Sequence, residues 1–170
     1  ESLEAKKQKK ILVVDDEQNV PMMFKRKFRK QTAFEFLFAA DGQEALNILE
    51  QHPDTRLVLS DLEMPVMDGM TLLKQLRWFD GHIIIISAYA DYDRQRNAKE
   101  AGAFDVLSKP IIWDDLERAM RHALRTSSQI KRLEAQNRRL EGEKQELKAE
   151  NQTLQKRLAE LEALLAAKTT

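Results

Sequence analysis

The chain has 170 residues, of which 42% are hydrophobic and 33% are charged, so it has room for one ordinary domain and an appendage. Lysine and arginine together number 28, as do aspartate and glutamate, and the net charge of zero gives no support for general attraction to nucleic acid or anionic membranes. The absence of cysteine excludes disulfide bonds and thiolate metal sites.

Residues 1–8 form a charged N-terminal extension that lacks the apolar core of a signal peptide. Nowhere in the sequence does an apolar run approach the ~20 residues that a bilayer span requires. We therefore expect a cytoplasmic protein with no membrane partner.

Residues 9–126 contain five short apolar runs that alternate with stretches of helical spacing. Apolar strands separated by helices of roughly 10–15 residues are typical of a parallel sheet covered on both faces. The pattern predicts a five-stranded, doubly wound α/β domain. The expected strands are residues 11–14, 34–40, 57–60, 82–87 and 104–107, and the expected helices are marked by Met22, Met23 and Phe28, by Ala45, Leu46 and Leu49, by Leu72, Leu73 and Leu76, by Ala98 and Ala101, and by Leu116, Met120 and Leu124.

Residues 127–167 are predicted to form a coiled-coil helix. A strict seven-residue repeat runs from Ile130 to Leu165, and its d positions are all leucine, which is a strong coiled-coil signal. No proline or glycine separates this segment from the domain, so we expect the last helix of the domain to continue into the coil, with residues 168–170 as a tail. The d positions are Leu133, Leu140, Leu147, Leu154 and Leu161.

The polar residues of the repeat indicate how two such helices pair. Asn137 and Asn151 occupy a positions and favour a parallel, in-register homodimer, because each asparagine can pair with its twin across the axis. Opposite charges also meet between the helices of that dimer, Glu143 with Lys148 and Arg157 with Glu162. The alternative, one long solvated helix, would leave the whole leucine seam in water.

Charged and hydroxyl side chains follow the expected strands at their C-terminal ends, where open parallel sheets place their ligands. Asp15 and Asp16 follow the first strand, Asp61 the third, Ser87 ends the fourth and Lys109 follows the fifth. Three neighbouring carboxylates repel one another unless a cation lies among them, and hard oxygen ligands favour Mg²⁺. The lysine and the hydroxyl suit a phosphoryl group, to whose oxygens both can donate hydrogen bonds.

Four segments give the chain a resemblance to the receiver domain of two-component response regulators: KILVVDDE (10–17), LVLSDLEMPVMDG (57–69), IIIISA (83–88) and VLSKP (106–110). The resemblance implies a flavodoxin-like sheet of strand order 2-1-3-4-5. It also implies that a histidine kinase or phosphotransfer protein donates a phosphoryl group to Asp61, whose carboxylate acts as the nucleophile.

The same resemblance assigns roles to the other site residues. It implies that Asp16 and Asp61 ligate Mg²⁺ directly, with the main-chain carbonyl of Glu63 as a third protein ligand, and that Asp15 holds the ion through water. Ser87 and Lys109 would bind the phosphoryl oxygens. The Lys109-Pro110 peptide bond would be cis.

Some positions depart from the commonest receiver pattern. Val106 stands three residues before the lysine, where many receivers have an aromatic residue, and Phe104 would share its face but lie about 7 Å further from the phosphoryl end. Tyr89 and Glu63 occupy positions that border the phosphoryl site in this family. We expect the bulk of Tyr89 to hinder the attacking water and so to lengthen the life of the phosphorylated state.

Other interpretations of the sequence make different demands. Asp15 or Asp16 could simply cap the first helix. Separately, a degenerate receiver could serve as a coiled-coil scaffold, but the complete acidic set argues against degeneration. A zipper-type DNA-binding protein needs a dense basic segment before the first heptad, and residues 125–132 are only sparsely basic. An aspartate-dependent phosphohydrolase needs a second aspartate where Glu63 stands.

The expected chemistry is self-directed, with phosphotransfer to the chain itself and slow autodephosphorylation, so we do not expect a turnover enzyme. Receivers usually act on a further domain, whereas this chain stops after its coil. We therefore expect either that the coil is the output or that the output domain is missing from the chain.

Overall fold

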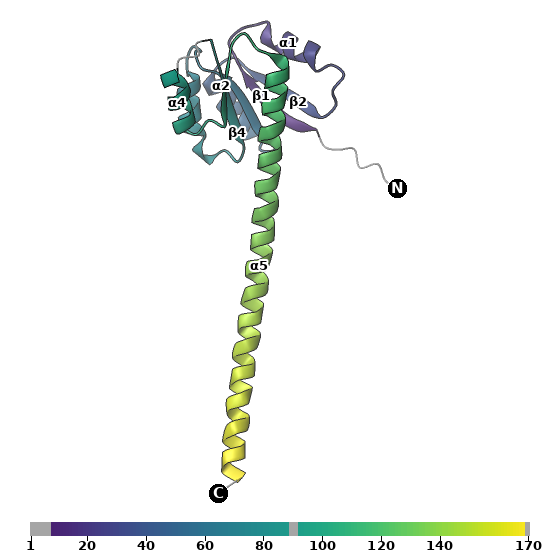
Figure 1. The fold of residues 1–170 in the computed structure, drawn as a ribbon, viewed down its shortest axis with the longest axis vertical. Coiled ribbons are helices and arrows are strands. Elements are labelled where there is room, and N and C mark those ends of the chain that lie inside the picture. The colour runs from purple at the N-terminus through teal and green to yellow at the C-terminus, as the bar shows by residue number, and fades with distance from the viewer. Residues whose placement is uncertain (1–7, 89–91, 169–170) are drawn as a thin grey trace. The chain divides into compact units, whose positions relative to one another are not determined.

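The structure is a computed structural model that describes residues 8–88 and 92–168. The chain divides into two compact units, with the boundary between Ser127 and Ser128. The first unit carries the sheet and its covering helices, and the second is helical (Figure 1).

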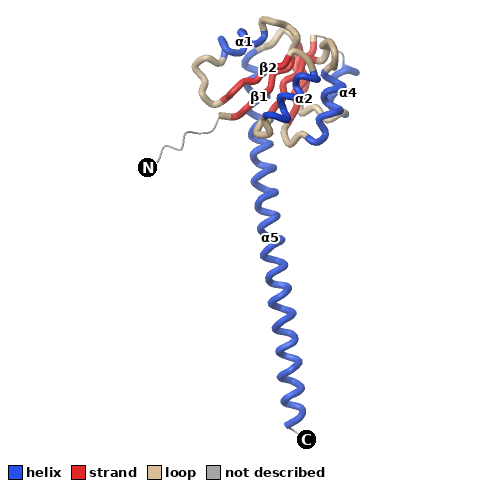
Figure 2. Tube along the Cα trace, turned by 180° about the vertical axis from the view of Figure 1, so that it is seen from behind, coloured by secondary structure: helices blue, strands red, loops and turns tan. Residues whose placement is uncertain are grey.

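The first unit is built on a five-stranded parallel sheet in the order β2-β1-β3-β4-β5, which confirms the predicted topology. The strands appear as neighbouring red segments in Figure 2. Each strand lies within a residue or two of its predicted position, which shows how well apolar runs bounded by polar residues mark buried parallel strands. Their bounds are β1 Lys9–Val14, β2 Phe34–Ala39, β3 Leu57–Asp61, β4 His82–Ser87 and β5 Asp105–Ser108.

A helix follows each strand, as the alternating pattern predicts. The helices are α1 Val20–Lys27, α2 Gly42–Gln51, α3 Gly69–Gln75, which a short 3₁₀ turn (Leu76–Trp78) extends, α4 Tyr92–Glu100 and α5 Trp113–Lys168. Among the described residues, no helix combines the length and the apolar character that crossing a bilayer requires.

The two faces of the sheet bury separate apolar clusters. Ile11 and Val13 of β1 face a cluster with α1 and the first turns of α5, while Leu12 and Val14 face a second cluster with α2, α3 and α4. This alternation follows from the two-residue period of a strand. Because both faces are covered, the strands have continuous apolar sequences.

Helix α1 buries a different face from the one its methionines indicated. Val20, Phe24 and Phe28 follow one another at four-residue intervals and are buried, whereas Met22 is 74% exposed. The ring of Phe24 lies 5.3 Å, centroid to centroid, from that of Phe36 on β2. Aromatic packing therefore holds α1 against β2, the strand at one edge of the sheet.

The expectation that Phe104 shares a face with Val106 is wrong. Phe104 precedes the first residue of β5 and packs between the rings of His82 and His122, at centroid distances of 4.5 and 5.1 Å. Val106 packs against the cluster on the opposite face of the sheet. The strand begins one residue later than predicted, so its alternation does not extend back to Phe104.

Helix α5 runs without a break through the predicted junction, so the expected continuation is confirmed. In the second unit its leucines at d are exposed, from 52% for Leu140 to 65% for Leu147. Asn137, Lys144 and Asn151 are exposed as well. The structure contains a single chain, and the coiled coil itself remains a prediction.

We predict that Phe24→Ala lowers the free energy of unfolding by about 3–5 kcal/mol, because a buried ring is lost from a packed cluster. Urea denaturation at fixed protein concentration measures this change. Met22→Ala on the same helix is the matched control and should alter stability by less than about 0.5 kcal/mol, since its side chain is exposed. Equal effects of the two substitutions would contradict the assignment of the buried face.

Candidate functional site

Carboxylates from two adjacent strands meet at the C-terminal edge of the sheet. Strand β1 pairs directly with β3, so Asp15 and Asp16, which follow β1, lie beside Asp61 at the end of β3. Each of the three side chains offers an oxygen, and these oxygens lie within 4.8 Å of one another. Asp61 is 8% exposed, so its negative charge is held largely out of water. Charge of one sign at this density requires compensation.

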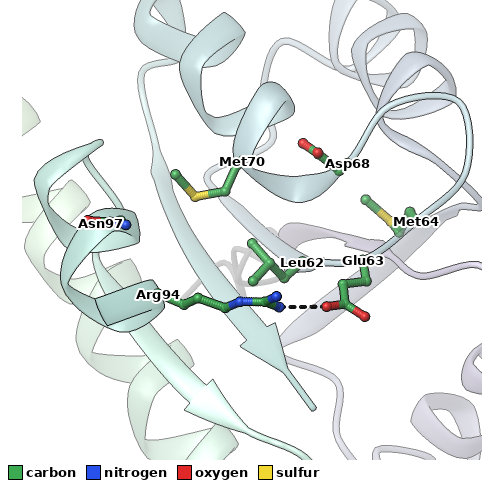
Figure 3. A pocket seen from close by; sticks show the side chains of 7 residues that line it. All are labelled: Leu62, Glu63, Met64, Asp68, Met70, Arg94 and Asn97. Carbon is green, nitrogen blue, oxygen red and sulfur yellow. Dashed lines mark hydrogen bonds and ion pairs between the residues drawn. The ribbon is translucent and has the colours of Figure 1, made fainter. Parts of the chain in front are cut away.

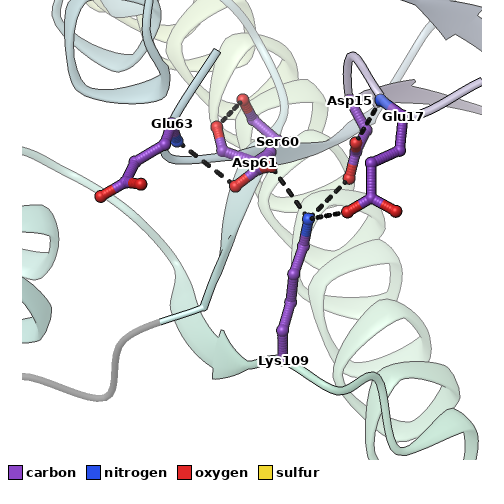
Figure 4. Close-up of polar contacts among 6 residues, drawn as sticks. All are labelled: Asp15, Glu17, Ser60, Asp61, Glu63 and Lys109. Carbon is purple, nitrogen blue, oxygen red and sulfur yellow. Dashed lines mark hydrogen bonds and ion pairs between the residues drawn. The ribbon is translucent and has the colours of Figure 1, made fainter.

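Lys109 provides that compensation from the loop after β5 (Figure 4). Its ammonium donates hydrogen bonds to Asp61 Oδ2 at 2.9 Å, Asp15 Oδ2 at 3.0 Å and Glu17 Oε1 at 3.3 Å. Burial alone would lower the pKa of Lys109, but the hydrogen bonds to Asp61 and Asp15 outweigh burial and raise this pKa above its ordinary value. The ammonium is therefore charged at neutral pH.

Main-chain donors orient two of the carboxylates. The Glu17 N–H donates to Asp15 Oδ1 at 2.9 Å, and the Glu63 N–H donates to Asp61 Oδ1 at 3.3 Å. Helix α1 begins only at Val20, with Asn19 at its N-cap. Asp15 and Asp16 therefore do not cap that helix.

The structure places Ser87 at the end of β4, where it is buried. Its carbonyl oxygen accepts a hydrogen bond from the Lys109 N–H at 2.7 Å, so the ends of β4 and β5 are joined next to the carboxylates. The Lys109-Pro110 peptide bond is cis, as the resemblance implies. Tyr89, which we expect to slow hydrolysis, lies outside the described residues.

Gly69, at the start of α3, packs directly on the main chain of Asp61. A Cβ atom at this position would overlap the Asp61 carbonyl oxygen, and the Gly69 N–H donates to the Leu62 carbonyl at 2.9 Å. Asp68 caps α3 by accepting a hydrogen bond from the Thr71 N–H at 2.7 Å, and this bond lowers the pKa of the Asp68 carboxyl. The Asp68-Gly69 turn thus holds the loop after β3 against the site.

A pocket of about 450 Å³ opens next to Glu63 (Figure 3). Leu62, Met64 and Met70 supply its apolar lining, and Asp68 and Asn97 add polar groups. Arg94 of α4 also lines the pocket and forms an ion pair with Glu63, with Nη1 and Oε1 2.6 Å apart.

Comparison with known proteins agrees with this geometry. The profile of the response regulator receiver domain matches residues 11–121. The chain belongs to this family. Regulatory protein AtoC of Escherichia coli (strain K12) is 38% identical to this receiver over 127 residues, which are 73% of this chain and 27% of that protein.

In two further comparisons, the matched region covers most of the other protein's chain. Sporulation initiation phosphotransferase F of Bacillus subtilis (strain 168) is 35% identical over 122 residues, which are 70% of this chain and 96% of that protein. The CheX-CheY-BeF3-Mg²⁺ complex from Borrelia burgdorferi contains a chain that is 28% identical to this one, with a TM-score of 0.63, over 68% of this chain and 89% of that chain.

Receiver domains generally bind Mg²⁺ at an acidic pocket and are phosphorylated by histidine kinases or phosphotransfer proteins. The residues of this receiver fit such an ion, because Asp15, Asp16 and Asp61 present the hard oxygen ligands that Mg²⁺ prefers. The structure thus brings together the three carboxylates and the lysine that the strand ends indicated.

Other contacts of the site were not singled out from the sequence. The position of Glu17 directly after the aspartate pair could have indicated that its carboxylate lies near the site. The Asp68-Gly69 pair is typical of a turn, but the close approach of Gly69 to Asp61 depends on how the loop folds back. Arg94 lies far along the chain from Glu63, and no local pattern connects the two.

We predict that Gly69→Ala lowers the free energy of unfolding by about 1–3 kcal/mol, because the added methyl group forces the loop away from Asp61. Thermal or urea unfolding of the first unit measures the loss. Gly142→Ala is the control, since a methyl group there meets no atom within 4 Å. A Gly69→Ala protein as stable as the parent would show that the loop and Asp61 do not approach this closely.

Proposed function

We propose that this receiver is a phosphorylation switch in which Asp61 accepts a phosphoryl group from a histidine kinase or phosphotransfer protein. The single observation that carries the proposal is the position of Asp61 between two further aspartates and the ammonium of Lys109. A carboxylate oxygen of Asp61 attacks phosphorus, the P–N bond of the phosphohistidine breaks, and the departing imidazole takes up a proton. The product is an acyl phosphate on the receiver itself.

Each neighbouring side chain has a role in this reaction. Lys109 already donates to Asp61 Oδ2, and after transfer its ammonium stabilises the phosphoryl oxygens as a point charge. The hydroxyl of Ser87, at the adjacent strand end, donates to one of those oxygens. Because the only acceptor is the receiver's own aspartate, the reaction changes the state of the receiver and is not turnover of a separate substrate.

Asp15, Asp16, Asp61 and the main-chain carbonyl of Glu63 would hold Mg²⁺. When bound, the ion supplies positive charge that offsets the phosphoryl oxygens during transfer. Two similarities support this part of the proposal. One relative is named as a phosphotransferase, and a solved neighbour is a complex with BeF3 and Mg²⁺. A degenerate receiver would lack part of the acidic set, which is complete here.

We expect the receiver to gain the mass of one phosphoryl group at Asp61 when it is incubated with acetyl phosphate and Mg²⁺. Intact-mass and peptide mass spectrometry measure the modification and its position, and chelation of Mg²⁺ should abolish it. Asp61→Asn should remain unmodified. Asp54→Asn is the matched control, because Asp54 pairs with Lys10 before β3 begins, at the opposite end of that strand. A wild-type protein that stays unmodified would overturn the proposal.

We further propose that the second unit forms a parallel homodimeric coiled coil through residues 127–167. The exposed leucines at d form a seam that a single helix leaves in water. A second copy of the chain buries that seam, pairs Asn137 and Asn151 with their twins, and brings Glu143 near Lys148 of the second copy. In the single chain Glu143 binds Arg139 of its own helix at 2.9 Å.

A constitutive coil would give phosphorylation a specific mode of action. The coil keeps two receivers together before any phosphate is transferred. Phosphorylation then changes the relative orientation of the receivers, and it does not drive association of monomers. The surface that responds is the one formed by α4, β5 and the first turns of α5.

The unphosphorylated chain should therefore sediment as a dimer at micromolar concentration. Leu147→Glu combined with Leu154→Glu should yield a folded monomer, because charges at d positions cannot be buried. Ala135→Glu combined with Ala149→Glu is the matched control, since both positions lie on the face opposite the seam. Analytical ultracentrifugation distinguishes the states, and a monomeric wild-type chain would reject the dimer.

A further inference from the structure

The ion pair between Arg94 and Glu63 links α4 to the loop that directly follows the phosphoacceptor at the end of β3. Arg94 lies in the first turn of α4 and reaches along the pocket beside the site to Glu63 (Figure 3). Its Nη1 is 2.6 Å from Glu63 Oε1, at the short end of charge-assisted hydrogen bonds. This contact joins two segments that no strand pairing connects directly.

Glu63 is tied to the reacting carboxylate through its main chain. Its N–H donates to Asp61 Oδ1 at 3.3 Å, yet its side chain points away from Asp61 (Figure 4). The Glu63 side chain is 60% exposed, so packing does not fix its rotamer. The ion pair with Arg94 is the contact that favours the outward direction.

The direction of this carboxylate matters because the site already contains excess negative charge. The ammonium of Lys109 binds the carboxylates of Asp15, Glu17 and Asp61. A fourth carboxylate, that of Asp16, lies beside Asp15 and Asp61. A phosphoryl donor is itself an anion and must approach this edge. In water, one more unpaired carboxylate at ~5 Å lowers the equilibrium occupancy of the site by an anionic donor roughly fourfold for each unit of donor charge.

We propose that Arg94 is a positioning residue for phosphoryl transfer, which acts by holding the Glu63 carboxylate away from Asp61. The inference rests on the proposed function, since it concerns the approach of a phosphodonor to that same aspartate. Arg94 does not touch the reacting atoms. It neutralises Glu63 and keeps the negative charge of Glu63 out of the donor's path.

The neighbouring arginine on α4 provides an internal control. Arg96 binds Asp93 and Glu100 within its own helix, at 3.1 and 3.8 Å. Its removal takes the same charge and the same length of side chain from α4 but leaves Glu63 paired. Arg94 and Arg96 thus separate the effect of the loop contact from the general effect of losing a cation on this helix.

The test compares initial rates of Asp61 phosphorylation by acetyl phosphate at saturating Mg²⁺, measured by mass spectrometry. Arg94→Ala should slow the reaction about threefold to tenfold, with a smaller defect for the less negatively charged donor phosphoramidate. The defect should shrink as ionic strength rises, because salt screens the freed carboxylate. Arg96→Ala should match the wild type.

The double variant Arg94→Ala with Glu63→Gln decides between positioning and structural roles. If Arg94 acts through the Glu63 charge, the double variant should react within about twofold of Glu63→Gln alone. A double variant as slow as Arg94→Ala, or an Arg94→Ala protein as fast as the wild type, would overturn the inference. Failure of the wild type to react at Asp61 would instead overturn the proposed function on which the inference rests.

Discussion

Negative charge held at one edge of the sheet is the constraint around which the first unit is arranged. Asp61 is nearly buried beside two further aspartates, and Lys109 is the ammonium that contacts two of the three. The hydrogen bonds between the ammonium and the carboxylates offset the cost of holding these charges in a poorly solvated position. Under the proposed function, a phosphoryl group on Asp61 would add negative charge to this cluster and change its hydrogen bonds.

The surrounding fold holds these charged groups close together. The order of the strands places β1 beside β3, which brings the Asp15 pair against Asp61. Gly69 lets the following loop return onto the Asp61 main chain, and the bond from Lys109 N–H to the Ser87 carbonyl ties β5 to β4. These main-chain contacts fix the positions of Asp61 and Lys109, whose charged side chains meet at the site.

The second unit is organised by its heptad repeat. Its leucines repeat at coiled-coil spacing and remain exposed along a single helix, while polar residues such as Asn137, Lys144 and Asn151 interrupt the seam at a positions. Apolar side chains in such a row favour a partner helix, and polar ones limit which register that partner can take. The residues of the heptad repeat and the residues of the carboxylate site are therefore separate sets, one in each unit.

The pattern of apolar runs predicted the alternation of strands and helices and the strand ends that carry the carboxylates, and the family resemblance implied the order of the strands. Apolar periodicity is a local property, and parallel strands end at one edge, so the sequence predicts that Asp61 and Lys109 lie at the same edge of the sheet. Three features became clear from the folded chain alone: the rings that Phe104 contacts, the close approach of Gly69 to Asp61, and the ion pair of Arg94 with Glu63. Those features depend on loops and helices meeting in space, and the spacing of residues along a chain carries no record of such distances.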